Sequence, residues 1–229
     1  MNRPFVFINV AMTADGKIDT FARKGAAISS ARDRERVDIL RAESDAVMVG
    51  GRTLLDEDPK LTVKSDALRA ERLARGLSAN PMKVGVVTEA KLGPSSKFLH
   101  EGTAKVVIFT TDRTSKVQLE FLRSRGVEVF VHAGAPVDLS LALQSLKDLG
   151  VRRLMVEGGA TLNFELLRLG LVDEVSAYVA PMIFGGESAP TMAAGAGLPR
   201  SGGEAIPLKL MRVESWDDGG VLLKYSIQR

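Results

Sequence analysis

A glutamate followed by two glycines is the feature of this sequence that indicates chemistry most directly. Glu157 ends an apolar run typical of a buried strand, and Gly158 and Gly159 lead into a segment with helical spacing near Thr161. The first turn of a helix carries unpaired backbone N–H groups and partial positive charge, and glycine lets an anion approach them. The turn therefore predicts a phosphate site, with the Glu157 carboxylate beside it for a second ligand. A glycine pair that serves turn geometry only is the alternative.

A second glycine-rich turn follows another apolar run. Gly50 and Gly51 end that run, Thr53 follows, and carboxylates occupy positions 56–58. The carboxyl ends of parallel strands meet at one edge of a sheet, so both turns are expected at the edge where ligands bind. Adjacent carboxylates without a histidine make a poor transition-metal site, and nothing further indicates magnesium. We therefore expect no metal.

Other polar positions near strand ends are weaker candidates. Asn9 lies in an otherwise apolar run and needs a hydrogen-bonding partner if it is buried, while Asp15 begins an Asp-Gly turn. A structural role fits both residues. Arg113 suits a 2′-phosphate because of its guanidinium geometry, and a surface arginine is the alternative. His100 and His132 have no partner motif, and we expect neither to be catalytic.

Apolar runs alternate with amphipathic segments through most of the chain, which predicts an α/β fold with a mainly parallel sheet flanked by helices. The last three strands have no helix between them, and residues 217–220 are typical of a hairpin turn, so an antiparallel element should finish the sheet. We expect one domain over residues 1–229, with a long loop over residues 184–203. Helices are expected over residues 30–43, 66–75, 115–125, 138–149 and 161–169, and strands over 5–12, 46–49, 82–88, 105–110, 127–131, 152–156, 174–180, 206–216 and 221–227.

Composition excludes several classes of protein. The 229 residues are 45% hydrophobic and 26% charged, as in soluble globular proteins, and no apolar run has membrane-spanning length. The absence of cysteine excludes disulfides and thiol chemistry and fits a reducing compartment, so we expect a cytoplasmic protein. A net charge of +3 with 5% aromatic residues gives little support for nucleic-acid binding. We expect neither a nucleic-acid nor a membrane partner.

Seven segments together resemble the reductase domain of riboflavin biosynthesis, which has a dihydrofolate-reductase-like fold. They hold their order over nearly the whole chain and comprise residues 9–17, 40–46, 49–53, 58–63, 156–162, 170–175 and 180–186. The resemblance implies an NADPH-dependent reductase that acts on a phosphorylated ribosylaminopyrimidine. The sugar opens to an imine, and hydride transfer to C1′ gives the ribitylamino product. We expect no deaminase domain before residue 1, so the chain is similar to the stand-alone members, which use 2,5-diamino-6-ribosylamino-4(3H)-pyrimidinone 5′-phosphate.

The resemblance also implies roles for individual residues, with Arg41 and Lys64 at the sugar phosphate. Glu157 and Asp15 are candidate proton donors, and water is a third. Two positions depart from the family. Glu57 stands where aspartate is common, and Lys64 stands where some members have arginine. A lysine keeps the positive charge but cannot make the two-pronged phosphate contact of an arginine. The implied NADPH contacts are Thr53, Glu57, Thr88, Gly158, Gly159, Ala160, Thr161 and Leu162, and the implied substrate contacts are Asn9, Arg41, Leu61, Lys64 and Glu157.

The family further implies a homodimer, formed through the C-terminal β element, whose edge would otherwise be exposed. Two alternative functions stay open from the sequence. One is an NADPH reductase of the same fold that acts on a pterin or another pyrimidine-like substrate. The other is a nucleotide-binding regulator without turnover, in which Arg41 and Lys64 would have no role.

Overall fold

The computed structural model describes residues 2–198 and 205–228 and divides into two compact units. Unit one comprises Met1–Pro4 and Val37–Met155, and unit two comprises Phe5–Arg36 and Val156–Arg229. Helix α1 (Ala31–Glu43) and strand β6 (Arg153–Val156) each contain the boundary between the units. The expected single domain over residues 1–229 stays a prediction, and each unit is described by itself.

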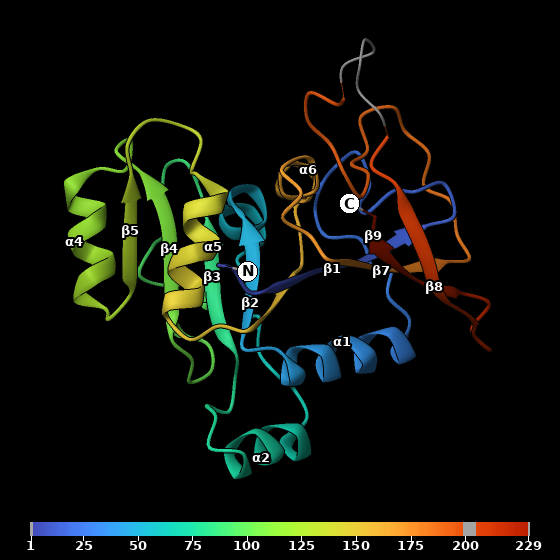
Figure 1. Ribbon diagram of the computed structural model, residues 1–229, viewed down its shortest axis with the longest axis horizontal. Helices are drawn as coiled ribbons and strands as arrows, with labels where there is room; N and C mark the ends of the chain where they lie inside the picture. Colours follow the sequence, from blue (N-terminus) through green and yellow to red (C-terminus); the bar gives the residue numbers. More distant parts are fainter. Residues whose placement is uncertain (1, 199–204, 229) are drawn as a thin grey trace. The chain divides into compact units, whose positions relative to one another are not determined.

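Unit one contains a parallel sheet (Figure 1). Its strands follow the order β5-β4-β3-β2-β6, and β2 pairs with β3, β3 with β4, and β4 with β5, all in parallel. Every residue of β2 and β4 is buried, which explains why the sequence shows continuous apolar runs there rather than alternation. The strands are β2 (Ala46–Gly50), β3 (Met82–Val86), β4 (Val106–Thr111) and β5 (Glu128–His132).

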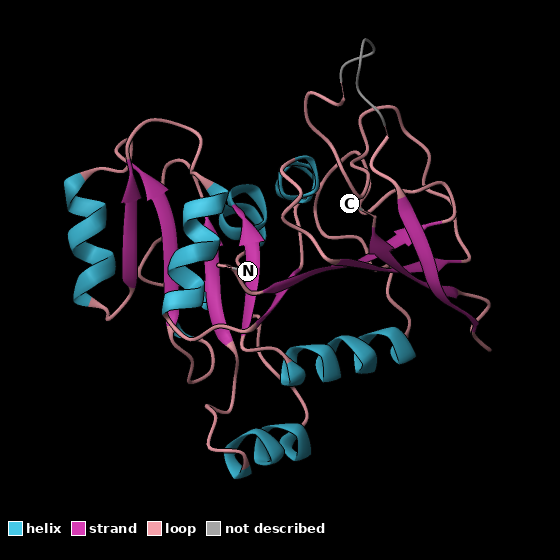
Figure 2. Cartoon of the chain, in the orientation of Figure 1, coloured by secondary structure: helices cyan, strands magenta, loops and turns pink. Residues whose placement is uncertain are grey.

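Figure 2 shows the helices in cyan, and three helices of unit one begin and end at local sequence signals. Ser65, Ser115 and Asp138 cap the first turns of three helices by accepting backbone N–H bonds. A glycine of positive φ follows each of these helices, and a residue with a side chain would be strained at that φ. The three helices are α2 (Asp66–Ala74), α4 (Lys116–Ser124) and α5 (Leu139–Asp148).

Two helical turns of unit one were not expected from the sequence. Residues Thr53–Glu57 form a π-helix, η1, and residues Lys97–His100 form the single turn α3. Leu54 anchors η1 because its side chain is fully buried, and it would lie 2.7 Å from a Cβ placed on Gly85 of β3. The lack of a side chain at Gly85 therefore lets η1 pack against the sheet.

Unit two contains the antiparallel element that the sequence predicted. Strand β1 (Phe5–Thr13) pairs in parallel with β7 (Glu174–Ala180), β7 pairs antiparallel with β9 (Val221–Ile227), and β9 pairs antiparallel with β8 (Leu208–Ser215). The hairpin between β8 and β9 is closed by a bond from the Trp216 N–H to the Gly220 carbonyl, 2.9 Å long. The expected α/β fold, mainly parallel with an antiparallel end, is confirmed.

One core cluster of unit two contains two stacked aromatic rings. The rings of Tyr178 and Trp216 stack with centroids 5.1 Å apart and pack with Ile28 and Leu222.

Helix α6 (Ala160–Arg168) begins directly after Gly159. Residues 184–198 form the expected long loop, whose only ladder contact in the described part is a bridge between Lys17 and Thr191; residues 199–203 of that prediction lie outside the described residues. None of the described helices has the length and apolar character that a membrane crossing requires.

Candidate active site

The second half of helix α1 fixes the backbone of the loop that carries Lys64. The Arg41 Nη1 donates to the Thr62 carbonyl at 3.0 Å. One oxygen of the buried Asp38 carboxylate accepts the Lys64 N–H at 2.6 Å, and the other accepts the Ser65 N–H at 2.8 Å. The guanidinium of Arg41 thus lies at the backbone two residues before Lys64, so the structure brings the predicted basic pair to one loop.

A third cation lies at the same loop. The Arg69 Nη1 donates to the carbonyls of Val63 at 2.8 Å and Lys64 at 2.7 Å, and the guanidinium also pairs with the exposed Asp66. Neither Asp38 nor Arg69 was among the sequence candidates. For Asp38, the spacing of three residues from Arg41 on one helix was the available signal, since it places both on one face.

Leu61, a predicted substrate contact, is part of the core. Its side chain is 1% exposed, and its φ of 49° lies in the left-handed region, which is uncommon for a residue with a branched side chain. A ligand cannot reach this side chain in the structure. Any contact between Leu61 and a substrate would therefore come from its backbone.

The carboxylates at positions 56–58 have different environments. Asp58 accepts bonds from the Ser96 hydroxyl at 2.7 Å and from the backbone N–H groups of Lys97 at 2.7 Å and Phe98 at 2.9 Å. Burial raises the pKa of Asp58, but these hydrogen bonds outweigh it and hold the pKa below its ordinary value. Asp58 is therefore an anionic cap for α3, whereas the cofactor candidates Thr53 and Glu57 are the first and last residues of η1.

Thr88 follows strand β3, two residues beyond its end at Val86. Its carbonyl accepts bonds from the Thr111 hydroxyl at 2.7 Å and from the Thr110 hydroxyl at 3.4 Å, both at the end of β4. These bonds fix the backbone at this predicted cofactor position. Arg113 is exposed in the turn after β4, where its N–H donates to the Thr111 hydroxyl at 3.3 Å, and its predicted contact with a 2′-phosphate stays a prediction.

At the Glu157 turn, strand β6 ends at Val156 and helix α6 begins at Ala160, as expected from the sequence. Gly158 has a φ of 99°, which strains any side chain, and its peptide bond to Gly159 is cis. Gly159 is the N-cap of α6 and has no side chain with which to cap that helix start. The backbone N–H groups at the start of α6 therefore have the chemistry that a phosphate needs. On helix α6, Asn163 is buried and donates from Nδ2 to the Met192 carbonyl at 2.9 Å.

Asp15 anchors the long loop of unit two. Its carboxylate accepts bonds from the Thr13 hydroxyl at 2.5 Å, the Phe184 N–H at 3.2 Å and the Gly185 N–H at 2.8 Å. The Thr13 hydroxyl, followed by these N–H groups, lowers the pKa of Asp15. A carboxyl that is ionised at neutral pH is a poor proton donor, so these contacts favour the structural role.

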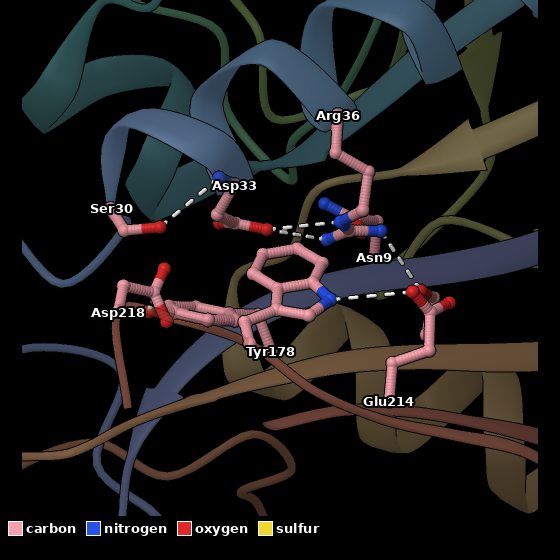
Figure 3. A network of polar contacts seen from close by, with 9 residues as sticks. Asn9, Ser30, Asp33, Arg36, Tyr178, Glu214 and Asp218 are labelled. Atoms are coloured by element: carbon pink, nitrogen blue, oxygen red, sulfur yellow. Dashed lines mark hydrogen bonds and ion pairs between the residues drawn. The ribbon is translucent and has the colours of Figure 1, made fainter. Parts of the chain in front are cut away.

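Asn9 has the partner that its burial requires. Its side chain is 7% exposed, and Oδ1 accepts a bond from the Arg36 Nη2 at 2.7 Å (Figure 3). Sequence reasoning did not find Arg36, because the two residues lie 27 positions apart and no pattern connects them.

The two histidines make contacts that are consistent with structural roles. Nε2 of His100 lies 2.6 Å from the Pro94 carbonyl, and the His132 ring meets the edge of Phe109 with centroids 6.1 Å apart. Over residues 2–198 and 205–228 there is no group of three or more histidine and acidic side chains placed to hold a metal ion.

Comparison with known proteins shows the family of this chain. A sequence model described as the RibD C-terminal domain matches residues 4–223. The 2,5-diamino-6-ribosylamino-4(3H)-pyrimidinone 5′-phosphate reductase of Archaeoglobus fulgidus is 42% identical over 193 residues, which are 84% of this chain and 87% of that protein. The protein of the same name from Methanothermobacter thermautotrophicus is 42% identical over 210 residues, 92% of each chain.

Solved structures share the fold. A pyrimidine reductase-like protein from Corynebacterium diphtheriae has a TM-score of 0.83 at 21% identity and covers 100% of this chain and 93% of its own. The RibD protein of Acinetobacter baumannii has a TM-score of 0.79 at 27% identity over 100% of this chain and 59% of its own. The resemblance inferred from the sequence is confirmed: this chain belongs to the RibD C-terminal domain family, whose members include pyrimidinone phosphate reductases of riboflavin biosynthesis.

Proposed function

We propose that this chain is an NADPH-dependent oxidoreductase that reduces 2,5-diamino-6-ribosylamino-4(3H)-pyrimidinone 5′-phosphate to its ribitylamino product. The observation that carries the proposal is 42% identity to two reductases of that name over 84% and 92% of the chain. In the reaction, the ribose opens to an imine, C1′ gains a hydride and the adjacent nitrogen gains a proton, so the C=N bond becomes a C–N bond.

The loop of residues 62–65 is the proposed site of the sugar phosphate. Arg41, Lys64 and Arg69 contribute three positive charges there, and the two guanidinium groups also donate to backbone carbonyls of this loop. Asp38 restrains the Lys64 backbone, which lowers the backbone entropy lost when the loop orders on a ligand. A phosphate bound by such donors gains charge-assisted hydrogen bonds worth about 1.5–3 kcal/mol each.

The proposed cofactor contacts of unit one are Thr53, Glu57 and Thr88. The packing of Leu54 and the bonds to the Thr88 carbonyl hold the backbone at these positions. When bound, NADPH supplies the hydride. The protein's contribution is to place the donor and acceptor carbons in contact and to exclude water.

The proposed cofactor contacts of unit two are Gly158, Gly159, Ala160, Thr161 and Leu162. The turn fits a phosphate group, because φ at Gly158 disfavours a side chain and the N-cap of α6, Gly159, has no side chain to block the approach. For the substrate we propose Asn9 and Glu157 through their side chains and Leu61 through its backbone. Glu157 or water is the proposed source of the proton, since the contacts of Asp15 favour an anionic anchor.

We also propose a homodimer formed through strand β8. This strand ends the sheet order, and four of its apolar side chains are 40–57% exposed: Leu208, Leu210, Met211 and Val213. An exposed apolar edge strand favours pairing with another chain. Light scattering after gel filtration should give twice the mass of one chain, and the double variant Leu210→Lys, Val213→Lys should give the mass of one. The cytoplasmic location stays a prediction.

The test of the function is NADPH oxidation by the purified protein, with the diamino pyrimidinone phosphate and its deaminated counterpart offered in parallel. Faster turnover of the diamino compound is expected. Faster turnover of the deaminated compound would make that compound the substrate. If the protein binds NADPH but turns over neither compound, the result would favour a reductase of a pterin-like substrate or a regulator without turnover.

A further inference from the structure

Arg36 makes four hydrogen bonds in the interior of unit two (Figure 3). Its Nη2 donates to the Asn9 Oδ1 at 2.7 Å, and its Nη1 donates to the Ser176 hydroxyl at 3.0 Å. Nε and Nη2 also donate to one oxygen of Asp33, at 3.0 and 2.8 Å. The Asp33 side chain is fully buried and that of Arg36 is 16% exposed, so the pair is shielded from solvent.

The strands explain why these groups meet. Asn9 of β1 and Ser176 of β7 are direct partners in the parallel ladder, so their side chains leave the sheet on the same face. Asp33 and Arg36 lie three residues apart on α1, on one helix face. Arg36 therefore connects one face of α1 to two neighbouring strands.

These contacts determine the orientation of the Asn9 amide. A guanidinium has donors only, so the group of Asn9 that faces Arg36 must be the carbonyl oxygen. The opposite corner of the amide is then Nδ2, a donor. Without Arg36 the amide can turn over and present either atom, because the two ends are similar in shape.

We propose that Arg36, held by Asp33 and Ser176, is a positioning residue that makes Asn9 a hydrogen-bond donor toward an acceptor atom of the substrate. The proposal rests on the proposed function, in which Asn9 contacts the pyrimidine substrate. It adds a direction to that contact, since the substrate atom that meets Asn9 must accept a hydrogen bond.

The direct test is a double-mutant cycle in kcat/KM for the pyrimidine, with wild type, Arg36→Lys, Asn9→Ala and the double variant. Lysine keeps the positive charge that the buried Asp33 needs and loses the planar fork, so folding is retained. We expect Arg36→Lys to lower kcat/KM about tenfold in the wild-type background and not to lower it further beside Asn9→Ala. Equal losses in both backgrounds would overturn the proposal, because Arg36 would then act independently of Asn9.

Asn9→Asp tests the direction of the hydrogen bond. The carboxylate keeps an acceptor for Arg36 but has no donor to replace Nδ2, so we expect a stable protein whose kcat/KM is lower by about 10- to 100-fold, with the KM for NADPH unchanged. Full activity of Asn9→Asp would refute the donor assignment. Arg34→Lys is the matched control, because Arg34 is an exposed arginine of the same helix whose side chain donates to the Ser29 carbonyl, and its kcat/KM should match the wild type.

A measurement without substrate separates this proposal from the proposed function. The side-chain amide of Asn9 should give rigid ¹⁵N–H₂ signals by NMR relaxation in the wild type, identified by their absence in Asn9→Asp, and mobile signals in Arg36→Lys. Equal mobility in both proteins would overturn the positioning role even if the wild type reduces the pyrimidine. An inactive wild type with the expected NMR change would overturn the proposed function alone.

Discussion

Lys83 should make the stability of this protein depend on pH in a range where few other groups titrate. It lies on strand β3 with 1% of its surface exposed, and its Nζ donates to the Phe98 carbonyl at 3.0 Å and to the Glu101 carbonyl. Burial lowers the pKa of Lys83 to about 8 from 10.5, against the smaller opposing effects of the Glu101 and Asp58 charges. The charged ammonium is thus bonded but remains costly to bury.

The sign of the effect follows from proton binding. Between about pH 8 and 10.5 the unfolded chain binds more protons at this residue than the folded chain, so folding stability rises with pH in that window. One pKa unit corresponds to about 1.4 kcal/mol, and integration from pH 7 to pH 9.5 gives a gain of about 2 kcal/mol from Lys83 alone.

The assay is urea unfolding of wild type and Lys83→Met at both pH values, followed by circular dichroism. The difference in unfolding free energy between the two proteins should move by about 2 kcal/mol in favour of the wild type at the higher pH. Lys116→Met, which changes an exposed lysine of α4, is the control, and its difference from wild type should stay constant. A constant difference for Lys83→Met as well would refute the assignment of a depressed lysine pKa.

Four further changes test the site. Lys64→Ala should raise the KM for the pyrimidine phosphate by about 10- to 100-fold and leave NADPH binding measured by fluorescence nearly unchanged; equal loss of both would contradict separate subsites. Gly159→Val should abolish NADPH binding by filling the approach to the helix start, and an unchanged Kd would remove the phosphate from this turn. Gly85→Ala places a methyl group 2.7 Å from Leu54 and should lower the unfolding free energy by about 1–3 kcal/mol. It should also weaken NADPH binding by displacing η1. A Tm equal to that of the wild type would show that Leu54 can move aside. Arg113→Ala should narrow the preference for NADPH over NADH in kcat/KM, and an unchanged ratio would place recognition of the 2′-phosphate elsewhere.

Local signals in the sequence predicted most of the elements, because their causes are local. Ser115 and Asp138 cap helices by bonding N–H groups two or three residues away, and Gly126 ends a helix by adopting positive φ. The hairpin after Trp216 follows from four consecutive turn-forming residues. The π-helix η1 was not predicted, because it depends on the space above Gly85, which only the folded sheet creates.

The site was predicted less completely, because its supporting contacts join distant parts of the chain. Asn9 was identified as a buried polar residue that needs a partner, but Arg36 is one of many arginines and its sequence gives no reason to select it. Asp38 and Lys64 are likewise 26 positions apart and meet through a backbone N–H, which leaves no trace in residue type.

The aspartates show what this means for predicting catalytic residues. Asp15, Asp38 and Asp58 each stand beside a predicted ligand contact, and each uses both carboxylate oxygens on groups of the protein's own chain, mainly backbone N–H. Such bonds fix the loops, and at Asp15 and Asp58 they also stabilise the anion and hold the pKa below its ordinary value. The carboxylates that bind loop backbone are therefore different groups from those proposed to bind the ligands. The proposed ligand-binding groups are the cations of the 62–65 loop, the backbone N–H groups at the start of α6 and the Asn9 amide. If that separation is correct, Asp38→Asn should raise the KM for the pyrimidine phosphate through Lys64 and leave kcat nearly unchanged, whereas Glu157→Gln should lower kcat.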